Sequence, residues 1–92
     1  MKTNLKAIFD VRKEFYGKAT IDIDSVKNEV KLYSYNTHVA TLKKGKVEVY
    51  GIYSATTLRH IKEFLKQNGF KGETKKQIID DYVLLYPLKG GE

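Results

Sequence analysis

The feature that most constrains this 92-residue chain is a helix whose two ends are both marked in the sequence. Ser54 is a good N-cap residue, because its hydroxyl can accept a hydrogen bond from a free amide of the first turn. Gly69 can take the left-handed conformation that ends a helix, and Phe70 after it can pack on Leu65. Between these ends one face is apolar at helical spacing and is predicted to be core: Leu58, Ile61, Phe64 and Leu65.

A basic stripe runs beside the apolar face of this helix. Arg59, Lys62 and Lys66 recur at positions i, i+3 and i+7, which places them on one side of a helix. The stripe has two interpretations: a solvated face with cations that suit the helix dipole, or an edge that contacts phosphates. Beyond the stripe lie Thr56, Glu63 and Gln67.

The composition is that of a soluble globular domain, with 41% hydrophobic and 30% charged residues and a single proline. The chain has no apolar run of membrane-spanning length and no signal peptide, so a cytoplasmic protein without a membrane partner is expected. The absence of cysteine excludes disulfides, a thiol nucleophile and a thiolate metal site. The net charge of +6 permits binding to nucleic acid, and the densest basic run is Lys43-Lys44-Gly45-Lys46.

From Phe15 onward the apolar residues alternate with polar ones at period two, which is typical of half-buried strands. Short loops separate the alternating segments, and parallel pairing would need long crossover connections, so an antiparallel meander is predicted. A hairpin loop is expected at Lys43-Lys44-Gly45. Four strands are expected, at about residues 18–23, 30–35, 37–42 and 46–50.

The whole chain is predicted to be one α+β domain over residues 1–92. Residues 1–14 form a short helix or an extended arm, residues 15–53 the four-stranded meander, and residues 54–86 two helices packed on one sheet face. The capping box Thr74-Lys75-Lys76-Gln77 opens the second helix, and Pro87 ends it. Residues 83–86 fit either the end of this helix or a further strand.

No pattern of catalytic residues is recognisable. His38 and His60 are the only histidines and lack metal-ligand spacing, and the carboxylate pairs are explained by turns or by solvent exposure. The run Glu29-Val30-Lys31 resembles the ExK element of metal-dependent nucleases, but no Pro-Asp precedes it. P-loop, dinucleotide-binding and nucleophile-elbow motifs are absent. We therefore expect a protein that is not an enzyme and that uses no cofactor or metal.

Three tyrosines form the most informative set outside the helix. Alternation places Tyr33, Tyr35 and Tyr50 on one sheet face, opposite the valines that the helices would cover. Aromatic and basic residues on an open sheet are used to stack and clamp single-stranded nucleic acid. The same pattern also fits cross-strand pairs that stabilise a solvated sheet, or a dimer interface.

Three segments resemble a family of small uncharacterised proteins carried by phages, plasmids and chromosomes of Gram-positive bacteria. They are Phe15 to Ala19, Tyr33 to Ala40 and, most specifically, the run YSATTLRHIKEFLKQNG of residues 53–69. The resemblance covers roughly residues 8–70. It implies a cytoplasmic bacterial protein of mobile-element origin and carries no known activity, so it transfers no catalytic residue.

Two functions are compatible with these patterns. The first is a non-catalytic accessory protein of a phage or plasmid that binds DNA or RNA; the alternative is a protein-interaction or inhibitor module that forms a homodimer or docks a host protein. For the first, phosphates would be contacted by the helix stripe and the lysine loop, and bases would stack on the tyrosines. The predicted site residues are Arg59, Lys62, Lys66, Lys43, Lys44, Lys46, Tyr33, Tyr35 and Tyr50.

Overall fold

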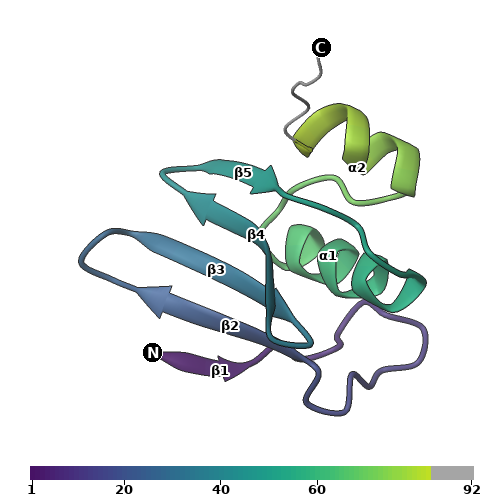
Figure 1. The fold of residues 1–92 in the computed structure, drawn as a ribbon, viewed down its shortest axis with the longest axis horizontal. Helices are drawn as coiled ribbons and strands as arrows, with labels where there is room; N and C mark the ends of the chain where they lie inside the picture. The colour runs from purple at the N-terminus through teal and green to yellow at the C-terminus, as the bar shows by residue number, and fades with distance from the viewer. Residues whose placement is uncertain (84–92) are drawn as a thin grey trace.

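The computed structural model describes residues 1–83 and has an α+β architecture, with one antiparallel sheet followed by two helices (Figure 1). The sheet has five strands rather than four, in the sequential order β1-β2-β3-β4-β5. Every strand therefore pairs with its neighbour in the chain, as expected for a meander. The elements are β1 (Lys2–Asn4), β2 (Ala19–Asp24), β3 (Glu29–Ser34), β4 (Thr37–Lys43), β5 (Lys46–Val49), α1 (Ala55–Gln67) and α2 (Lys75–Tyr82).

The extra strand lies at the N-terminus, in the segment for which a short helix or an extended arm was predicted. Lys2 pairs with Asp22 and Asn4 pairs with Thr20, so β1 extends the sheet beyond β2. The chain between β1 and β2 is a long loop in which Leu5 is buried, whereas Phe9 is half exposed. A three-residue strand has no periodicity of its own, and only the free edge of β2 defines it.

Tight turns and one bulge shape the meander. Lys44 and Gly45 link β4 to β5 with φ values of 52° and 78°, which confirms the predicted hairpin loop and its left-handed glycine. The pairing of β3 with β4 shifts between Leu32 and Tyr33. An extra residue in β4 at this bulge lets the consecutive Val39 and Ala40 both be buried.

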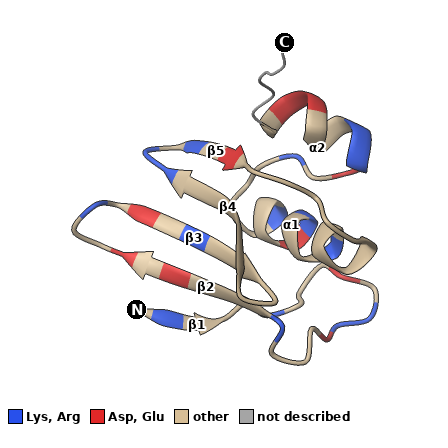
Figure 2. Cartoon of the chain, in the orientation of Figure 1, with Lys and Arg blue, Asp and Glu red and all other residues tan. Residues whose placement is uncertain are grey.

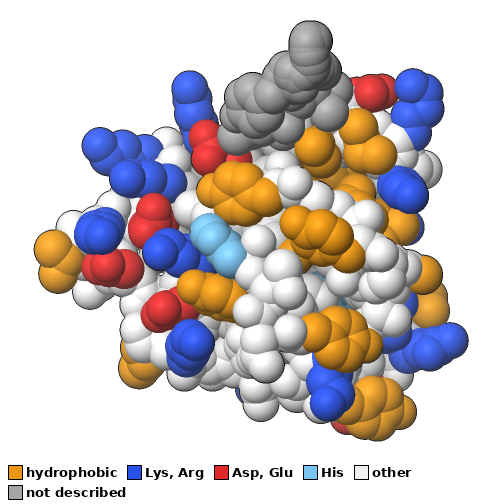
Figure 3. Space-filling model, in the orientation of Figure 1, with side chains coloured by type: hydrophobic (Ala, Val, Ile, Leu, Met, Phe, Trp, Pro, Cys, Tyr) orange, Lys and Arg blue, Asp and Glu red, His pale blue; other side chains and the backbone are white. Residues whose placement is uncertain are grey.

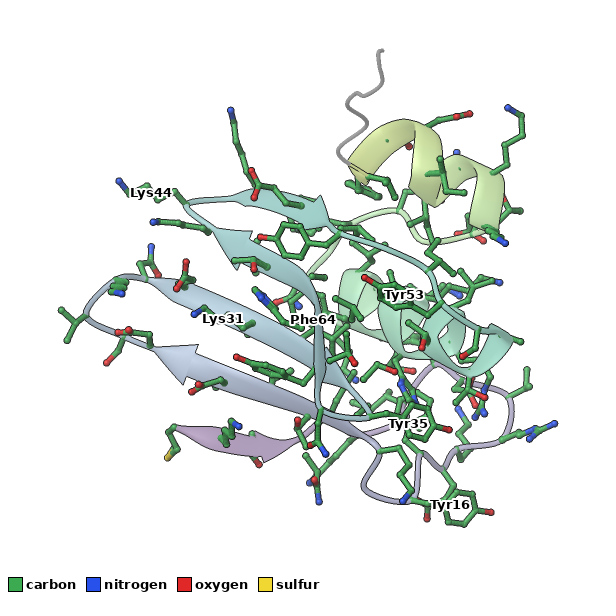
Figure 4. The ribbon with its side chains drawn as sticks, in the orientation of Figure 1. Tyr16, Lys31, Tyr35, Lys44, Tyr53 and Phe64 are labelled. Atoms are coloured by element: carbon green, nitrogen blue, oxygen red, sulfur yellow. The ribbon has the colours of Figure 1, made fainter. Side chains whose placement is uncertain are left out.

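The core lies between the sheet and the helices. The apolar residues of β2 to β5 that share one face form a single cluster with the apolar face of α1 and with Ile78 of α2. Figure 4 shows Phe64 of α1 beside the sheet. The fully buried aliphatic and aromatic members are Ala19, Leu32, Val39, Ala40, Val49, Ile61, Phe64, Leu65 and Ile78.

Both predicted ends of α1 are confirmed. The side chain of Ser54 accepts a hydrogen bond from the backbone N–H of Thr57 at 3.1 Å. At the other end Gly69 has a φ of +80°, and the N–H of Phe70 donates to the carbonyl of Leu65 at 2.8 Å. A further bond joins the N–H of Gly69 to the carbonyl of Lys66 at 3.2 Å. These two bonds define a Schellman motif, so local chemistry alone sets the length of the helix.

The outer side of α1 differs from its sequence pattern. Glu63, which the pattern places beyond the basic stripe, is 1% exposed. Its Oε1 accepts the backbone N–H groups of Phe9 and Asp10 at 2.8 and 2.9 Å, and its Oε2 accepts Nε2 of Gln67 at 2.6 Å. The loop after β1 thus crosses the helix and buries a second face, which helical periodicity cannot reveal.

The second helix begins where predicted but is shorter. Thr74 accepts the N–H of Gln77 at 3.1 Å, whereas the side chain of Gln77 accepts the N–H of Glu73 rather than that of Thr74. The helix ends at Tyr82, and Val83 pairs in parallel with Val49. The helix therefore does not include position 83, where the backbone is extended and forms a single isolated bridge. The remaining predictions, for residues 84–86, for Pro87 and for the tail, lie outside the described residues.

Candidate functional site

Arg59 of the predicted basic stripe is engaged within the protein. Its Nε donates to Oδ1 of Asp10 at 3.0 Å, its Nη2 donates to Oδ2 of Asp10 at 2.6 Å, and Nη2 also donates to the carbonyl of Glu14 at 3.1 Å. The hydrogen bond from Arg59 holds the pKa of Asp10 below its usual value of 3.8. Arg59 therefore ties α1 to the loop after β1, and most of its donor groups are occupied.

The other two residues of the stripe, Lys62 and Lys66, lie along a groove between α1 and residues 9–12. We call this the α1 groove; its volume is about 380 Å³. Arg12 adds a third cation from the loop, which the sequence analysis did not select. Figure 2 shows the repeated basic positions on α1. The groove is lined by Phe9, Asp10, Val11, Arg12, Arg59, Lys62, Glu63 and Lys66.

The open sheet face, which lies opposite the apolar core face, carries Tyr33 and Tyr50 as predicted, with His38 between them. The ring of His38 lies 5.3 Å from that of Tyr33 and 5.0 Å from that of Tyr50. Thr41 Oγ1 is hydrogen-bonded to His38 Nε2 at 2.7 Å and accepts a hydrogen bond from the Tyr50 hydroxyl at 3.0 Å. Lys2 lies 4.9 Å above the Tyr33 ring. Much of the aromatic surface here is used in internal contacts.

The charges on the open sheet face are balanced. The strand register forms the row Lys2–Asp22–Lys31–Thr41–Glu48 and the row Asp24–Glu29–Lys43–Lys46. Two of the lysines lie close to the same carboxylate, since Lys31 and Lys43 are 4.0 and 3.9 Å from Glu29. Figure 2 shows both basic and acidic positions on the strands. The four lysines in these rows are accompanied by four carboxylates, so the charges of the paired strands balance.

Tyr35 does not share the open sheet face with Tyr33 and Tyr50. It lies in the β3–β4 turn with a φ of 52°, and its ring is 5.9 Å from that of His60 on α1. The prediction that three tyrosines share one face is wrong for this residue, because the strand ends at Ser34 and alternation stops there. In Figure 4, Tyr35 and Lys44 lie at opposite ends of the sheet. The structure thus separates Tyr35 from the lysine hairpin.

Tyr35 instead lines a second hollow, of about 320 Å³, which we call the His60 hollow. The hollow lies where the turn at residues 15–18 meets the β3–β4 turn; the N–H of Tyr35 donates to the carbonyl of Lys18 at 2.9 Å. Figure 4 shows Tyr35 close to Tyr16, and Figure 3 shows several exposed hydrophobic side chains on this face. The lining residues are Arg12, Glu14, Phe15, Tyr16, Lys18, Tyr35, Thr56, Arg59 and His60.

The two hollows are neighbours, because Arg12 and Arg59 line both. Cations predominate in the α1 groove, and aromatic rings in the His60 hollow. The structure thereby places Arg59, Lys62, Lys66 and Tyr35 of the predicted site around these two hollows. A separate hollow of about 550 Å³ on the open sheet face is lined by four further predicted residues, Lys43, Lys44, Lys46 and Tyr50. Arg12 and Tyr16 were not among the predicted site residues. One feature of the sequence could have pointed to Tyr16: it directly precedes Gly17, at a turn position where asparagine or glycine is more usual than tyrosine.

The fold and these surfaces define a small α+β protein with a basic groove beside an aromatic hollow. The chain belongs to a family of unknown function, DUF8033, whose model matches residues 3–81. No curated protein and no solved structure matches the chain. Within residues 1–83 neither helix is long and apolar enough to cross a membrane, and no three histidine, cysteine or acidic side chains are grouped to hold a metal ion.

Proposed function

We propose that the protein is a non-catalytic module that binds single-stranded nucleic acid across the α1 groove and the His60 hollow. The observation that carries the proposal is the shared wall of the two hollows, formed by Arg12 and Arg59. Proteins that bind single strands combine a cationic path for the backbone with aromatic rings for the bases. Here the two parts are adjacent.

The charge distribution supports this location over the open sheet face. Lys62 and Lys66 are one turn apart on α1, and no ion pair to either is formed within residues 1–83. The strand lysines of the open sheet face lie among an equal number of carboxylates, which would repel phosphates. The backbone of the nucleic acid is therefore assigned to Arg12, Lys62 and Lys66, with Arg59 as a rigid support.

The test is a fluorescence-anisotropy titration of the full chain with single- and double-stranded DNA and RNA at several salt concentrations. Each phosphate contact on a single strand contributes about −0.7 to the slope of log K against log salt. The double variant Lys62→Ala/Lys66→Ala should reduce the magnitude of this slope by about 1.4. Arg59 is left unchanged because its loss would also release Asp10.

The matched control is Lys75→Ala/Lys76→Ala, which removes the same charge from the first turn of α2, where both lysines are exposed. It should leave the slope nearly unchanged if the α1 groove is the site. Equal losses in both double variants would indicate only non-specific attraction to the net charge. Absence of binding at low salt would refute the proposal.

A second candidate function, protein docking, is favoured by one observation. The open sheet face pairs balanced charges with the Tyr33–His38–Tyr50 cluster, and the Tyr50 ring is partly exposed. Tyrosine is enriched in protein interfaces, and a surface with charges of both signs selects a complementary partner. Light scattering over a range of concentrations tests self-association. A dimer that Tyr50→Ser dissociates would support this candidate, and a monomer at all concentrations would exclude the homodimer.

The resemblance to proteins of phages and plasmids suggests an accessory protein of a mobile element. A cytoplasmic location is consistent with a chain that contains no cysteine. Expression with and without an N-terminal secretion signal, followed by cell fractionation, would test whether the native chain remains in the cytoplasm.

A further inference from the structure

The His60 hollow has a polar floor within an aromatic wall. His60 is fully buried; the ring of Phe15 meets it edge-on at 4.7 Å, and the ring of Tyr35 lies 5.9 Å away. On the rim, Tyr35 is 51% exposed and Tyr16 is 78% exposed. The hollow therefore offers flat apolar surfaces near a buried imidazole.

A chain of hydroxyl groups orients the imidazole. The Ser54 hydroxyl donates to Oγ1 of Thr57 at 3.2 Å, Thr57 Oγ1 lies 3.0 Å from Ser34 Oγ, and Ser34 Oγ lies 2.8 Å from Nδ1 of His60. Each hydroxyl can donate or accept, and when their protons run from Ser54 toward His60, Nδ1 accepts. A neutral imidazole that accepts at Nδ1 carries its proton on Nε2.

The Nε2 atom of His60 is buried and has no hydrogen-bond partner among residues 1–83. Buried polar groups in folded proteins are nearly always paired, and an exception requires an explanation. Desolvation by burial lowers the pKa of His60 to about 4, so the ring is neutral at pH 7. A neutral N–H donor suits an uncharged acceptor such as a carbonyl oxygen or a ring nitrogen.

Tyr16 and Tyr35 adopt a backbone conformation that tyrosine rarely takes. Their φ values are 54° and 52°, and each is followed by another left-handed residue, Gly17 or Asn36. Asparagine or glycine is the usual residue at the first position of such turns. Strained residues of this kind persist mainly where the side chain has a function. Both rings line the same hollow, although they belong to different turns.

We propose that the His60 hollow holds one unstacked nucleobase, with His60 Nε2–H donating to an acceptor atom of the base and the Tyr35 and Tyr16 rings stacking on it. This inference rests on the proposed function and adds the site for the base. Arg12 and Lys18, which also line the hollow, would contact the flanking phosphates. Flat aromatic walls, a neutral donor and cations at the rim together match a nucleotide within a strand.

The experiment compares a short single-stranded oligonucleotide with an abasic oligonucleotide of the same length and charge. Both are titrated into the full chain, with the binding constant and the imidazole ¹⁵N resonances of His60 as readouts. We expect both oligonucleotides to bind through their phosphates. The base-bearing strand should bind more tightly than the abasic strand, by about tenfold or more, because stacking of a base adds to the affinity. Only the base-bearing strand should shift the Nε2 resonance of His60.

Tyr35→Asn tests the stacking, because asparagine tolerates the left-handed turn while removing the ring. It should reduce the difference between the two strands, because one of the stacking rings is lost. The control is Tyr53→Asn, which removes an exposed tyrosine that does not line the hollow and should preserve the difference.

Three results would overturn the inference while leaving the proposed function intact. They are equal affinity for the two strands, an Nε2 resonance that does not move at saturation, and a free protein whose imidazole proton resides on Nδ1. Failure of both strands to bind would overturn the proposed function together with the inference.

Discussion

The guanidinium of Arg59 and the carboxylate of Asp10 form a two-point ion pair across 49 residues of sequence, with N–O distances of 3.0 and 2.6 Å. Such paired geometry is stronger and more directional than a single contact. The pair fixes the loop after β1 against α1 and forms part of the wall between the α1 groove and the His60 hollow. The arrangement of both hollows thus depends on it.

Asp10→Asn should lower the free energy of unfolding by about 1–3 kcal/mol, because a partly buried guanidinium loses its charged partner. The pKa of Asp10 is lowered in the folded state, so its stabilisation is present above about pH 4 and is lost as the pH falls further. Urea denaturation at pH 7 and pH 3 measures both effects. Asp80→Asn, which breaks the exposed pair with Lys76, should change the stability by less than about 0.5 kcal/mol.

Glu63→Ala should destabilise the fold by about 2 kcal/mol or more, because two backbone N–H groups lose their shared acceptor. Glu63→Gln keeps an oxygen in place of Oε1 and should retain a large part of this stability. Thermal unfolding of the two variants gives the comparison, and hydrogen exchange at Phe9 and Asp10 should accelerate more in the alanine variant. Identical stability of both variants and the parent would contradict the role assigned to Glu63.

The free energy of unfolding should decrease as the pH falls from about 6.5 to 4. Burial, assisted by the charge of Arg59, lowers the pKa of His60 from 6.5 to about 4. The unfolded chain therefore binds a proton over this interval that the folded chain does not. His60→Leu should flatten the pH profile, whereas His38→Gln should leave the decrease in place. If His38→Gln flattened the profile instead, the loss of stability would be due to His38 and not to His60.

Gly69→Ala should destabilise the protein by about 1 kcal/mol or more, because its φ of +80° disfavours any residue with a Cβ. The added methyl group would meet no atom within 4 Å, so the loss reports backbone strain and not a clash. Differential scanning calorimetry provides the measurement. Gly45→Ala should destabilise the protein by a similar amount, because Gly45 has a φ of +78° and an added methyl group there also meets no atom within 4 Å.

Tyr16→Asn should leave the stability unchanged or raise it by up to about 1 kcal/mol, because asparagine adopts the left-handed region more readily than tyrosine. The Tyr16 side chain is largely exposed, so little packing is lost. The same variant should weaken binding of a base-bearing strand. A gain in stability with a loss of affinity would show that the strained tyrosine is kept for binding; a loss of stability would contradict the strain argument.

Several elements followed directly from local sequence. The caps at Ser54 and Gly69 and the alternation in the strands each depend on residues within one or two turns of one another. The predicted inward positions of Leu32 and Val49 are likewise confirmed, since a side-chain period of two leaves only one face for the core. The predictions were least accurate where regular structure ends, at the short β1, at the turn of Tyr35 and at the end of α2.

The sequence by itself determined the α+β class, the ends of α1 and the excess of positive charge. Only the tertiary structure decided which cations are free and which aromatic rings meet. Arg59 and Lys62 look equivalent on a helix, yet Asp10 engages only the first, from a loop 49 residues away. Local propensity acts over a few residues, whereas ion pairs and hollows form between segments that chain folding brings together. The candidate site depends on such contacts between distant segments.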